Sequence, residues 1–417
     1  MDGTGRLRDS LVTVVTVLAA SLCGMILWRD RANSFGDFSI FHLGSRLVRD
    51  GRAADAYDPE RFRQAWALDQ NLAGEPGELA VFISTPPFAL AMRPLTYLSV
   101  DAAALVWLAL GLVAFVVAIR LLGLPWWVNI IGLLSPIGLF NLKIAQTGYF
   151  ALLWAAILYR LCAQDRYVAA GVVAGLAVLK PTLLLGIALW WILDWRTWHK
   201  ALLAAAATGT TIVLSTLIAG IDQWRSFLDA LGALGALEGE VQFAQPTILE
   251  AVTRAFGDDV SGHPLALASY VVIGLLLMRT AIRRWPSQHG VLAGAAIIVS
   301  ILISPHLLIY DTTMLLVPFA IAVHHGVSTE RLQLLVGITF VTAVLTVVWI
   351  APLAPIQEWT SLATLGLIAV SALWSRWLGE PLTPITNEIV RPSLVDGELS
   401  QDRAEGTLPE APEQRAA

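Results

Sequence analysis

Long apolar stretches with few charges recur along almost the whole chain. A helix needs about 20 apolar residues to cross the hydrocarbon core of a bilayer. Residues 167–193 form a stretch too long for one ordinary span and contain Lys180-Pro181, so they predict two short helices that meet at the proline. The stretches cover 11–28, 101–119, 125–142, 150–162, 167–193, 201–221, 265–282, 291–303, 307–323, 332–350 and 362–374. They predict an all-α integral membrane protein, a polytopic helical bundle of about 11–12 transmembrane segments.

Composition agrees with this pattern and adds one distinct segment. Hydrophobic residues make up 56% of the 417 residues and charged residues 14%, well below the roughly 25% of soluble domains. The net charge of −5 equals the charge of the last forty or so residues, which are rich in acids and prolines. We therefore divide the chain into a cytoplasmic N-terminus (1–10), a membrane domain (11–376) and a disordered acidic cytoplasmic tail (377–417). No basic surface suggests nucleic acid.

Arginine and lysine in the short loops give an orientation. Cytoplasmic loops carry an excess of these residues, and one threading places all the basic short loops inside, provided that residues 81–100 do not cross the membrane. Pro86, Pro87 and Pro94 favour a re-entrant or interfacial segment there. Two long connections, 29–80 and 222–264, then face outward. In the first, apolar residues share a predicted helix with Arg46, Arg49 and Arg52, as in a helix lying in the membrane interface; they are Phe38, Phe41, Leu43, Leu47 and Val48.

Six polar residues gather at the outer ends of the predicted helices. They are Asp37, Lys143, Gln146, Lys180, His306 and Asp311. Ionisable groups at membrane depth are expensive and usually mark a substrate or ion pathway. A carboxylate can accept a proton from a hydroxyl, and lysine with histidine can hold a phosphate. These residues fit a substrate with an apolar tail and an anionic head.

Each of these residues also has a structural explanation. Asp37 would cap a helix that starts at Phe38. Lys143, at a helix end, would extend its ammonium to the interface. Lys180 would pair with Asp311, and His306 would bond a carbonyl freed by the preceding proline. The sequence leaves both explanations open for every residue.

The order of several short motifs resembles a known family. The motifs are Asp37-Phe38-Ser39-Ile40-Phe41, Gly51 through Ala56-Tyr57-Asp58, Thr85-Pro86-Pro87-Phe88-Ala89-Leu90 with Pro94-Leu95, Ala145-Gln146-Thr147-Gly148, residues 170–177 leading into Lys180-Pro181, and Ser304-Pro305-His306 with Tyr310-Asp311. Together they span about residues 11–376 and resemble glycosyltransferase family 87, polyprenyl-phosphate-sugar-dependent mannosyltransferases of GT-C architecture. The family often has glycine where Ala145 stands.

The resemblance implies a hexosyltransferase with Asp37 as the general base. A single displacement would invert the anomeric carbon of a polyprenyl-phosphate sugar. Lys180 and His306 would hold the donor phosphate, Gln146 and Asp311 would orient sugar or partner side chains, and Lys143 is a further substrate-binding candidate.

The same resemblance implies the partners and the location. The scheme needs no metal and no cofactor, since the lipid-linked sugar is a substrate. The expected partners are a polyprenyl-phosphate sugar as donor, a lipid or glycan as acceptor, and the surrounding membrane lipid. The expected location is the bacterial cytoplasmic (inner) membrane, with the active site on its outer face.

Two other classes of function fit some of these features. A transporter or flippase of lipid-linked or anionic substrates would use the same charged residues as a path. Such proteins usually carry paired repeats with broken helices in both halves, and the long outer loop with its carboxylate occurs once. A noncatalytic membrane scaffold predicts no gathering of polar residues on one side.

Overall fold

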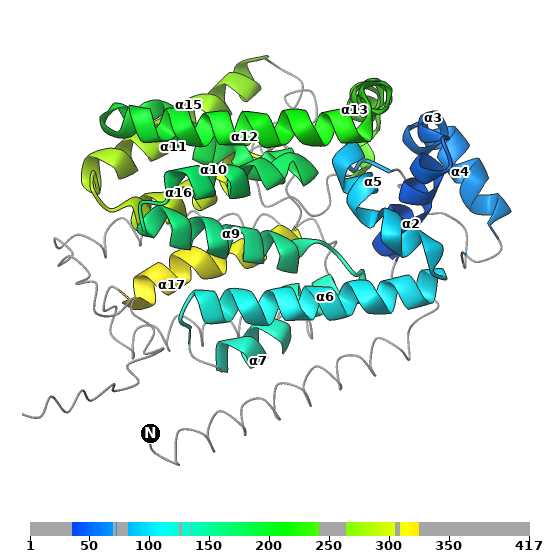
Figure 1. Cartoon of the computed structure of the whole chain (residues 1–417), viewed down its shortest axis with the longest axis horizontal. Helices are drawn as coiled ribbons and strands as arrows, with labels where there is room; N and C mark the ends of the chain where they lie inside the picture. The colour runs from blue at the N-terminus through cyan, green and yellow to red at the C-terminus, as the bar shows by residue number, and fades with distance from the viewer. Residues whose placement is uncertain are drawn as a thin grey trace, which may run out of the picture. The chain divides into compact units, whose positions relative to one another are not determined.

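The computed structural model describes residues 36–69, 72, 82–124, 127–134, 136–241, 264–304 and 309–324. Within these ranges the chain is helical and contains no strand (Figure 1). The predicted segments 11–28, 332–350 and 362–374 and the acidic tail lie outside the described residues. The all-α part of the fold prediction is therefore confirmed for the described ranges.

Five of the predicted apolar segments form helices close to their expected bounds. These are α6 (Val100–Leu121), α9 (Gly148–Ala163), α12 (Trp198–Ala219), α15 (Pro264–Arg284) and α16 (His289–Ile303). Two helical stretches, Val100–Leu121 and Trp195–Ala219, are long and apolar enough to cross a membrane. Five shorter apolar helical stretches accompany them, between Gly148 and Ile321. The pattern agrees with a polytopic membrane protein.

Proline decides where the predicted segment 167–193 is interrupted. Residues 167–193 form α10 (Tyr167–Gly175), two 3-10 turns (Leu176–Leu179 and Pro181–Leu184) and α11 (Leu185–Leu193). Lys180 lies between the turns in a non-helical conformation (φ −149°, ψ 82°), because the residue before a proline avoids the helical region. The predicted break is confirmed.

Two other apolar stretches are also divided, which the periodicity did not predict. Residues 125–142 form α7 (Trp127–Leu134) and α8 (Pro136–Lys143), so a new helix starts at Pro136. Residues 307–323 form a 3-10 segment (Ile309–Leu315) followed by α17 (Leu316–His324). Proline at the first position of a helix is favourable because its missing N–H would have no helical partner there.

Close packing of small residues holds the helices together. Helices α9, α10 and α12 lie alongside one another (Figure 1), and the Thr208 hydroxyl donates to the Gly171 carbonyl at 2.9 Å. A Cβ at Gly186 would lie 1.9 Å from the Ala296 carbonyl oxygen, so α11 and α16 approach at backbone distance. Every residue of α16 from Val291 to Leu302 is buried, which makes it a central helix.

Several helices expose large apolar side chains on their outer faces. On α12, for example, Leu217 is 73% exposed and Ile218 is 69% exposed. Similar side chains are exposed on α6 and α15: Leu105, Val106, Leu110, Val113, Val117, Val271, Val272, Leu276 and Leu277. Soluble monomers rarely expose such contiguous apolar surface. These faces are suited to lipid contact.

Short helices build the region that precedes α6. They are α2 (Gly36–Arg49), α3 (Ala53–Tyr57), α4 (Pro59–Leu68) and α5 (Pro86–Met92), followed by a 3-10 turn (Arg93–Tyr97). Neither α5, with 7 residues, nor the turn, with 5, is long enough to cross a membrane. α13 (Ile221–Val241) packs against α3, with the Phe227 ring edge-on to Tyr57 at 5.8 Å.

The structure corrects two predictions about α2. The helix ends at Arg49, and Arg52 precedes α3 instead of sharing α2, because Gly51 turns the chain with φ +77°. Phe38, Leu43 and Leu47 are at most 3% exposed, and they pack into protein clusters with residues of α5 and α6. The apolar face of α2 is therefore a core face and does not contact lipid as expected, and the position of α2 relative to the membrane interface stays a prediction.

Candidate active site

Asp37 lies at the start of α2 and is held by a distant amide. α2 begins at Gly36, so Asp37 belongs to its first turn and is not the predicted N-cap. A carboxylate there is stabilised by the positive end of the helix dipole. The Gln146 Nε2 group donates a hydrogen bond to Asp37 Oδ2. Burial raises the pKa of the half-buried Asp37 carboxyl, and the bond from Gln146 lowers it to a smaller extent.

A tight turn between α8 and α9 fixes Gln146. Its backbone N–H donates to the Asn141 carbonyl at 3.0 Å, and its side-chain oxygen accepts from the Thr147 N–H at 3.2 Å. Ala145 adopts a left-handed conformation with φ +50°, which residues other than glycine adopt only at an energetic cost. This conformation gives a physical reason why the family that the chain resembles often has glycine at this position. The Trp107 indole donates to the Ala145 carbonyl at 2.9 Å.

Asn141 connects this turn to the chain around Tyr310. Its Oδ1 accepts from the Gly148 N–H at 3.1 Å, and its Nδ2 donates to the Tyr310 carbonyl at 3.2 Å. A Cβ at Gly148 would lie 2.4 Å from both Asn141 Oδ1 and the Tyr310 carbonyl oxygen. Glycine is therefore required for this approach.

Lys180 and Asp311 form an ion pair next to the same tyrosine. Lys180 Nζ donates to Asp311 Oδ2 at 2.5 Å, and it lies 4.8 Å from the centre of the Tyr310 ring. The Asp311 side chain is fully buried, whereas 24% of the Lys180 side chain is exposed. The Thr85 hydroxyl donates to the Val178 carbonyl at 2.9 Å, which ties the start of α5 to the break at Lys180.

Tyr310 and Asn141 thus join two polar pairs that are far apart in sequence. Asp37 with Gln146 and Lys180 with Asp311 come from four regions of the chain and meet through these two residues. Four of the six predicted site residues are brought together. Sequence reasoning quoted Tyr310 without a role and missed Asn141, although an amide inside an apolar stretch was a usable signal.

The other two predicted site residues have different outcomes. Lys143 is the last residue of α8, and its side chain is exposed, so extension to the interface and substrate binding both stay predictions. His306 lies outside the described residues. Its proposed contact with phosphate is untested by the structure.

No group of three or more His, Cys, Asp or Glu side chains in the described ranges is arranged to hold a metal ion. The Lys180 ammonium lies over the Tyr310 ring, and Tyr310 is linked through Asn141 to Gln146. An ammonium has three donor hydrogens, and one of them bonds Asp311. The remaining donors can bond oxygens of a bound anion.

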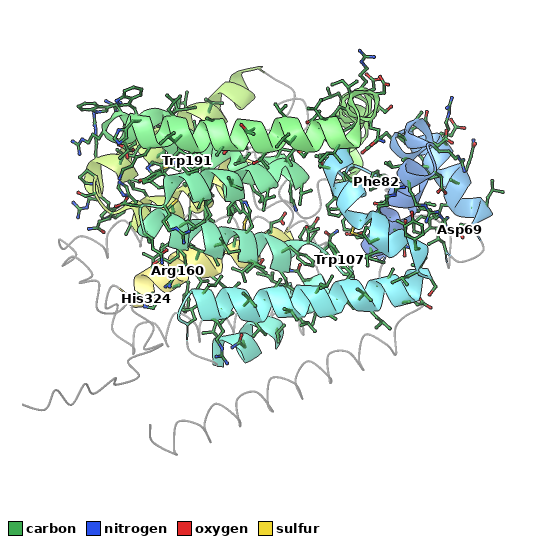
Figure 2. The ribbon with its side chains drawn as sticks, in the orientation of Figure 1. Asp69, Phe82, Trp107, Arg160, Trp191 and His324 are labelled. Carbon is green, nitrogen blue, oxygen red and sulfur yellow. The ribbon has the colours of Figure 1, made fainter. Side chains whose placement is uncertain are left out.

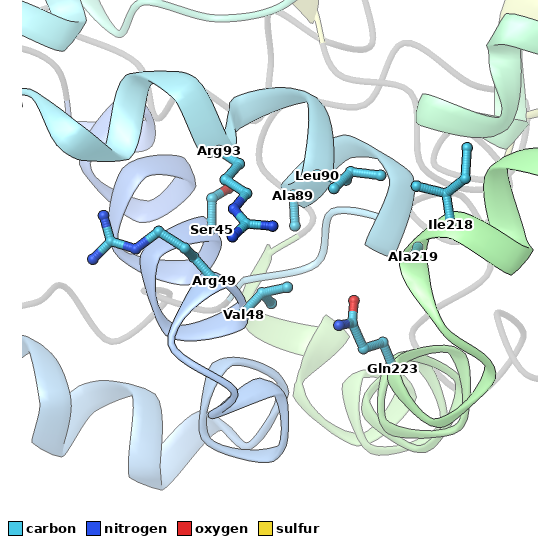
Figure 3. A pocket seen from close by; sticks show the side chains of 9 residues that line it. All are labelled: Ser45, Val48, Arg49, Ala89, Leu90, Arg93, Ile218, Ala219 and Gln223. Carbon is cyan, nitrogen blue, oxygen red and sulfur yellow. The ribbon is translucent and has the colours of Figure 1, made fainter.

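A pocket of about 220 Å³ lies farther along α2 (Figure 3). Ser45, Val48 and Arg49 line it from α2, and the residues of the two polar pairs do not. The pocket is therefore separate from the candidate acid–base chemistry at Asp37.

Comparison with known proteins supports the family resemblance. A family model for glycosyltransferase family 87 matches residues 82–309, which is more than half of the 417 residues. The matched range includes Gln146 and Lys180, begins after Asp37 and ends before Asp311. No curated protein and no solved structure matches the chain. The long apolar helices with their exposed faces, the polar network and this match lead to one conclusion: the chain is a membrane protein that belongs to glycosyltransferase family 87.

Proposed function

We propose that the chain transfers a hexose, mannose according to the resemblance, from a polyprenyl-phosphate-linked donor to a hydroxyl of a lipid or glycan acceptor. The reaction takes place at the outer face of the membrane. The observation that carries the proposal is the Asp37 carboxylate, held by Gln146 in the same network as the Lys180 ammonium. A base and a cation for a phosphate are the two groups that this transfer needs. Family membership favours an enzyme over a transporter or a scaffold.

Asp37 acts as the general base. Its carboxylate takes the proton of the acceptor hydroxyl while that oxygen attacks the anomeric carbon. Gln146 holds one carboxylate oxygen by donating to Oδ2, so the other oxygen can face the acceptor. Burial of Asp37 raises its pKa, which makes the carboxylate a stronger base than an exposed aspartate.

The bond between the anomeric carbon and the phosphate oxygen breaks as the new glycosidic bond forms. The polyprenyl phosphate leaves with the bonding electrons, and Lys180 stabilises its developing negative charge. His306 is a second candidate for this role. One displacement inverts the anomeric configuration, so the product carries the configuration opposite to that of the donor.

Replacing Asp37 by asparagine tests the proposal. Asparagine is nearly isosteric but cannot act as a carboxylate base, and general bases typically contribute about 10²–10⁴-fold. In purified protein with labelled polyprenyl-phosphate mannose, we expect Asp37→Asn to lower sugar transfer at least about 100-fold, while donor binding survives.

Asp101 provides a matched control. It is also an acid in the first turn of a helix, α6, and it is exposed. Asp101→Asn should leave transfer within about twofold of the unmodified protein, since surface substitutions have small effects. Near-normal turnover of well-folded Asp37→Asn would remove Asp37 from catalysis and make Asp311 the next candidate.

A further inference from the structure

The pocket beyond Asp37 is built by four elements. Ser45, Val48 and Arg49 come from α2, Ala89 and Leu90 from α5 with Arg93 directly after it, Ile218 and Ala219 from the end of α12, and Gln223 from α13. In Figure 3, the side chains of Arg93 and Gln223 point into the space between these helices, whereas the Arg49 guanidinium points away from the other lining side chains. The lining contains two arginines and no acid.

The arginines keep hydrogen-bond donors available. Arg93 is exposed and has no ion-pair partner among the described residues. Arg49 bonds Asp50 through Nε at 2.8 Å and the Thr96 carbonyl through Nη1 at 2.8 Å. Its Nη2 group makes no hydrogen bond within the described ranges. The Arg93 guanidinium, which faces the pocket with free donors, favours a phosphate or another planar or tetrahedral oxyanion.

Ser45 gives an independent sign of a ligand. The residue is 0% exposed, it lines the pocket, and its hydroxyl has no hydrogen-bond partner among the described residues. A buried hydroxyl without a partner is costly. An anion in the pocket would accept a hydrogen bond from it, and the Gln223 amide can donate as well.

The position of the pocket near the end of α12 indicates the source of the anion. Among the described residues, α12 lies in one of the two stretches that are long and apolar enough to cross a membrane, and it ends at Ala219, before Gly220 with φ +91°. Leu214, Leu217 and Ile218, just before that end, are 55–73% exposed. The pocket thus lies where an apolar outer face stops, which is the level of lipid headgroups. A phosphate bound there would leave its acyl or prenyl chains against α12.

We propose that this pocket binds the phosphate of an anionic membrane lipid. Arg93 donates to the phosphate oxygens, Ser45 donates through its hydroxyl, and the lipid chains run along the exposed face of α12. The site is distinct from the Lys180–Asp311 pair and does not depend on the identity of the sugar donor.

Binding of a fluorescent phosphatidylglycerol to the detergent-solubilised full-length protein tests this site. Arg93→Gln keeps the reach of the side chain but removes its charge, and Ser45→Ala removes the unpartnered hydroxyl. We expect Arg93→Gln to raise the dissociation constant at least about tenfold, as for loss of a charged hydrogen bond. Ser45→Ala should raise it about threefold or more.

Arg225→Gln is the matched control. Arg225 is an exposed arginine on α13, ion-paired with Asp222 and outside the pocket, and its loss should change binding less than twofold. Unlabelled phosphatidylglycerol should compete, whereas inorganic phosphate and phosphatidylcholine should compete at least about tenfold more weakly.

Three outcomes would overturn the proposal. Unchanged binding by both pocket variants would remove the pocket from lipid recognition. An equal loss of lipid binding in Arg225→Gln would show that the effect comes from the overall charge of the protein. Equal competition by inorganic phosphate would make the site one for free phosphate. Thermal unfolding of each variant separates these results from a folding defect.

Discussion

Two lysine–aspartate pairs lie at opposite ends of α10. Asp165 precedes the helix and pairs with Lys200 at 3.4 Å and with His289 Nδ1 at 2.7 Å. Lys180 follows the helix and its 3-10 turn and pairs with Asp311 at 2.5 Å. The side chain of Asp165 is 58% exposed, whereas that of Asp311 is fully buried.

The difference in exposure separates a structural feature from a candidate functional one. Exposed ion pairs typically contribute about 0–1 kcal/mol and cost little to form. A buried carboxylate loses its hydration, and the attraction of its partner often fails to offset that loss. The Lys180–Asp311 pair is therefore expensive for stability alone, which is the usual condition of a functional site.

The two ends also carry different sets of residues. Figure 2 shows Arg160, Trp191 and His324 at one end of the helices and Trp107, Phe82 and Asp69 at the other. His324 Nε2 lies 2.7 Å from the Leu122 carbonyl oxygen, so the ends of α17 and α6 meet on the side of Arg160. The described ends of the helices next to Leu122, Arg160 and Trp191 thus lie at one end, and Trp107, which bonds the turn at Ala145, lies at the other.

Cysteine labelling gives the largest expected contrast between the ends. A single cysteine at Arg61, whose side chain is 60% exposed on α4, should react with an impermeant maleimide from outside the cell. A cysteine at Ser287, next to the Asp165 cluster, should react only after the membrane is opened. The background replaces Cys23 and Cys162 by alanine. Labelling of Ser287→Cys but not Arg61→Cys in intact cells would reverse the predicted topology.

Removing the acid of each pair tests the difference in stability. Asp311→Ala leaves a mostly buried lysine without its partner and should lower the free energy of unfolding by at least about 2 kcal/mol. Asp165→Ala should lower it by less than about 1 kcal/mol. Thermal unfolding in detergent measures both. Equal effects of the two substitutions would contradict the distinction drawn from their exposure.

Replacing the lysine of each pair tests phosphate binding. Lys180→Met should raise KM for the polyprenyl-phosphate donor about tenfold, as for one lost charged hydrogen bond, and leave KM for the acceptor unchanged. Lys200→Met is the control at the other end. The double variant Lys180→Met with Asp311→Asn avoids an unpaired buried carboxylate and should show the same donor effect. Unchanged donor kinetics in both variants would exclude Lys180 from the site.

The smallest expected effect is a shift in pH dependence. Burial raises the pKa of Asp37, and the hydrogen bond from Gln146 lowers it. A base must be ionised, so kcat/KM falls as the pH drops through this pKa. Gln146→Leu removes the lowering contribution and should move this acid limb to higher pH. Gln288→Leu, beside His289 at the other end, should leave the profile unchanged, and an unmoved limb in Gln146→Leu would contradict the assignment of Asp37.

The raised pKa of Asp37 also makes the stability of the folded protein depend on pH. Its pKa is raised above the ordinary value, so the folded protein binds this proton more tightly than the unfolded chain does. Stability contributed by protonated Asp37 is present at low pH and is lost as the pH rises through the raised pKa. The site therefore keeps an ionisable group at a cost to stability under the conditions in which it works as a base.

The sequence by itself determined the all-helical class, the family and the break at Lys180-Pro181. Apolar length and the steric effect of proline on its neighbour are local properties, so they can be read along the chain. Only the tertiary structure decided that Gln146 bonds Asp37, 109 residues away, and that Lys180 meets Asp311, 131 residues away. It also showed that the apolar face of α2 is buried in protein and that Asn141 joins the two pairs. Such contacts depend on how helices from distant parts of the chain pack, which no local pattern encodes.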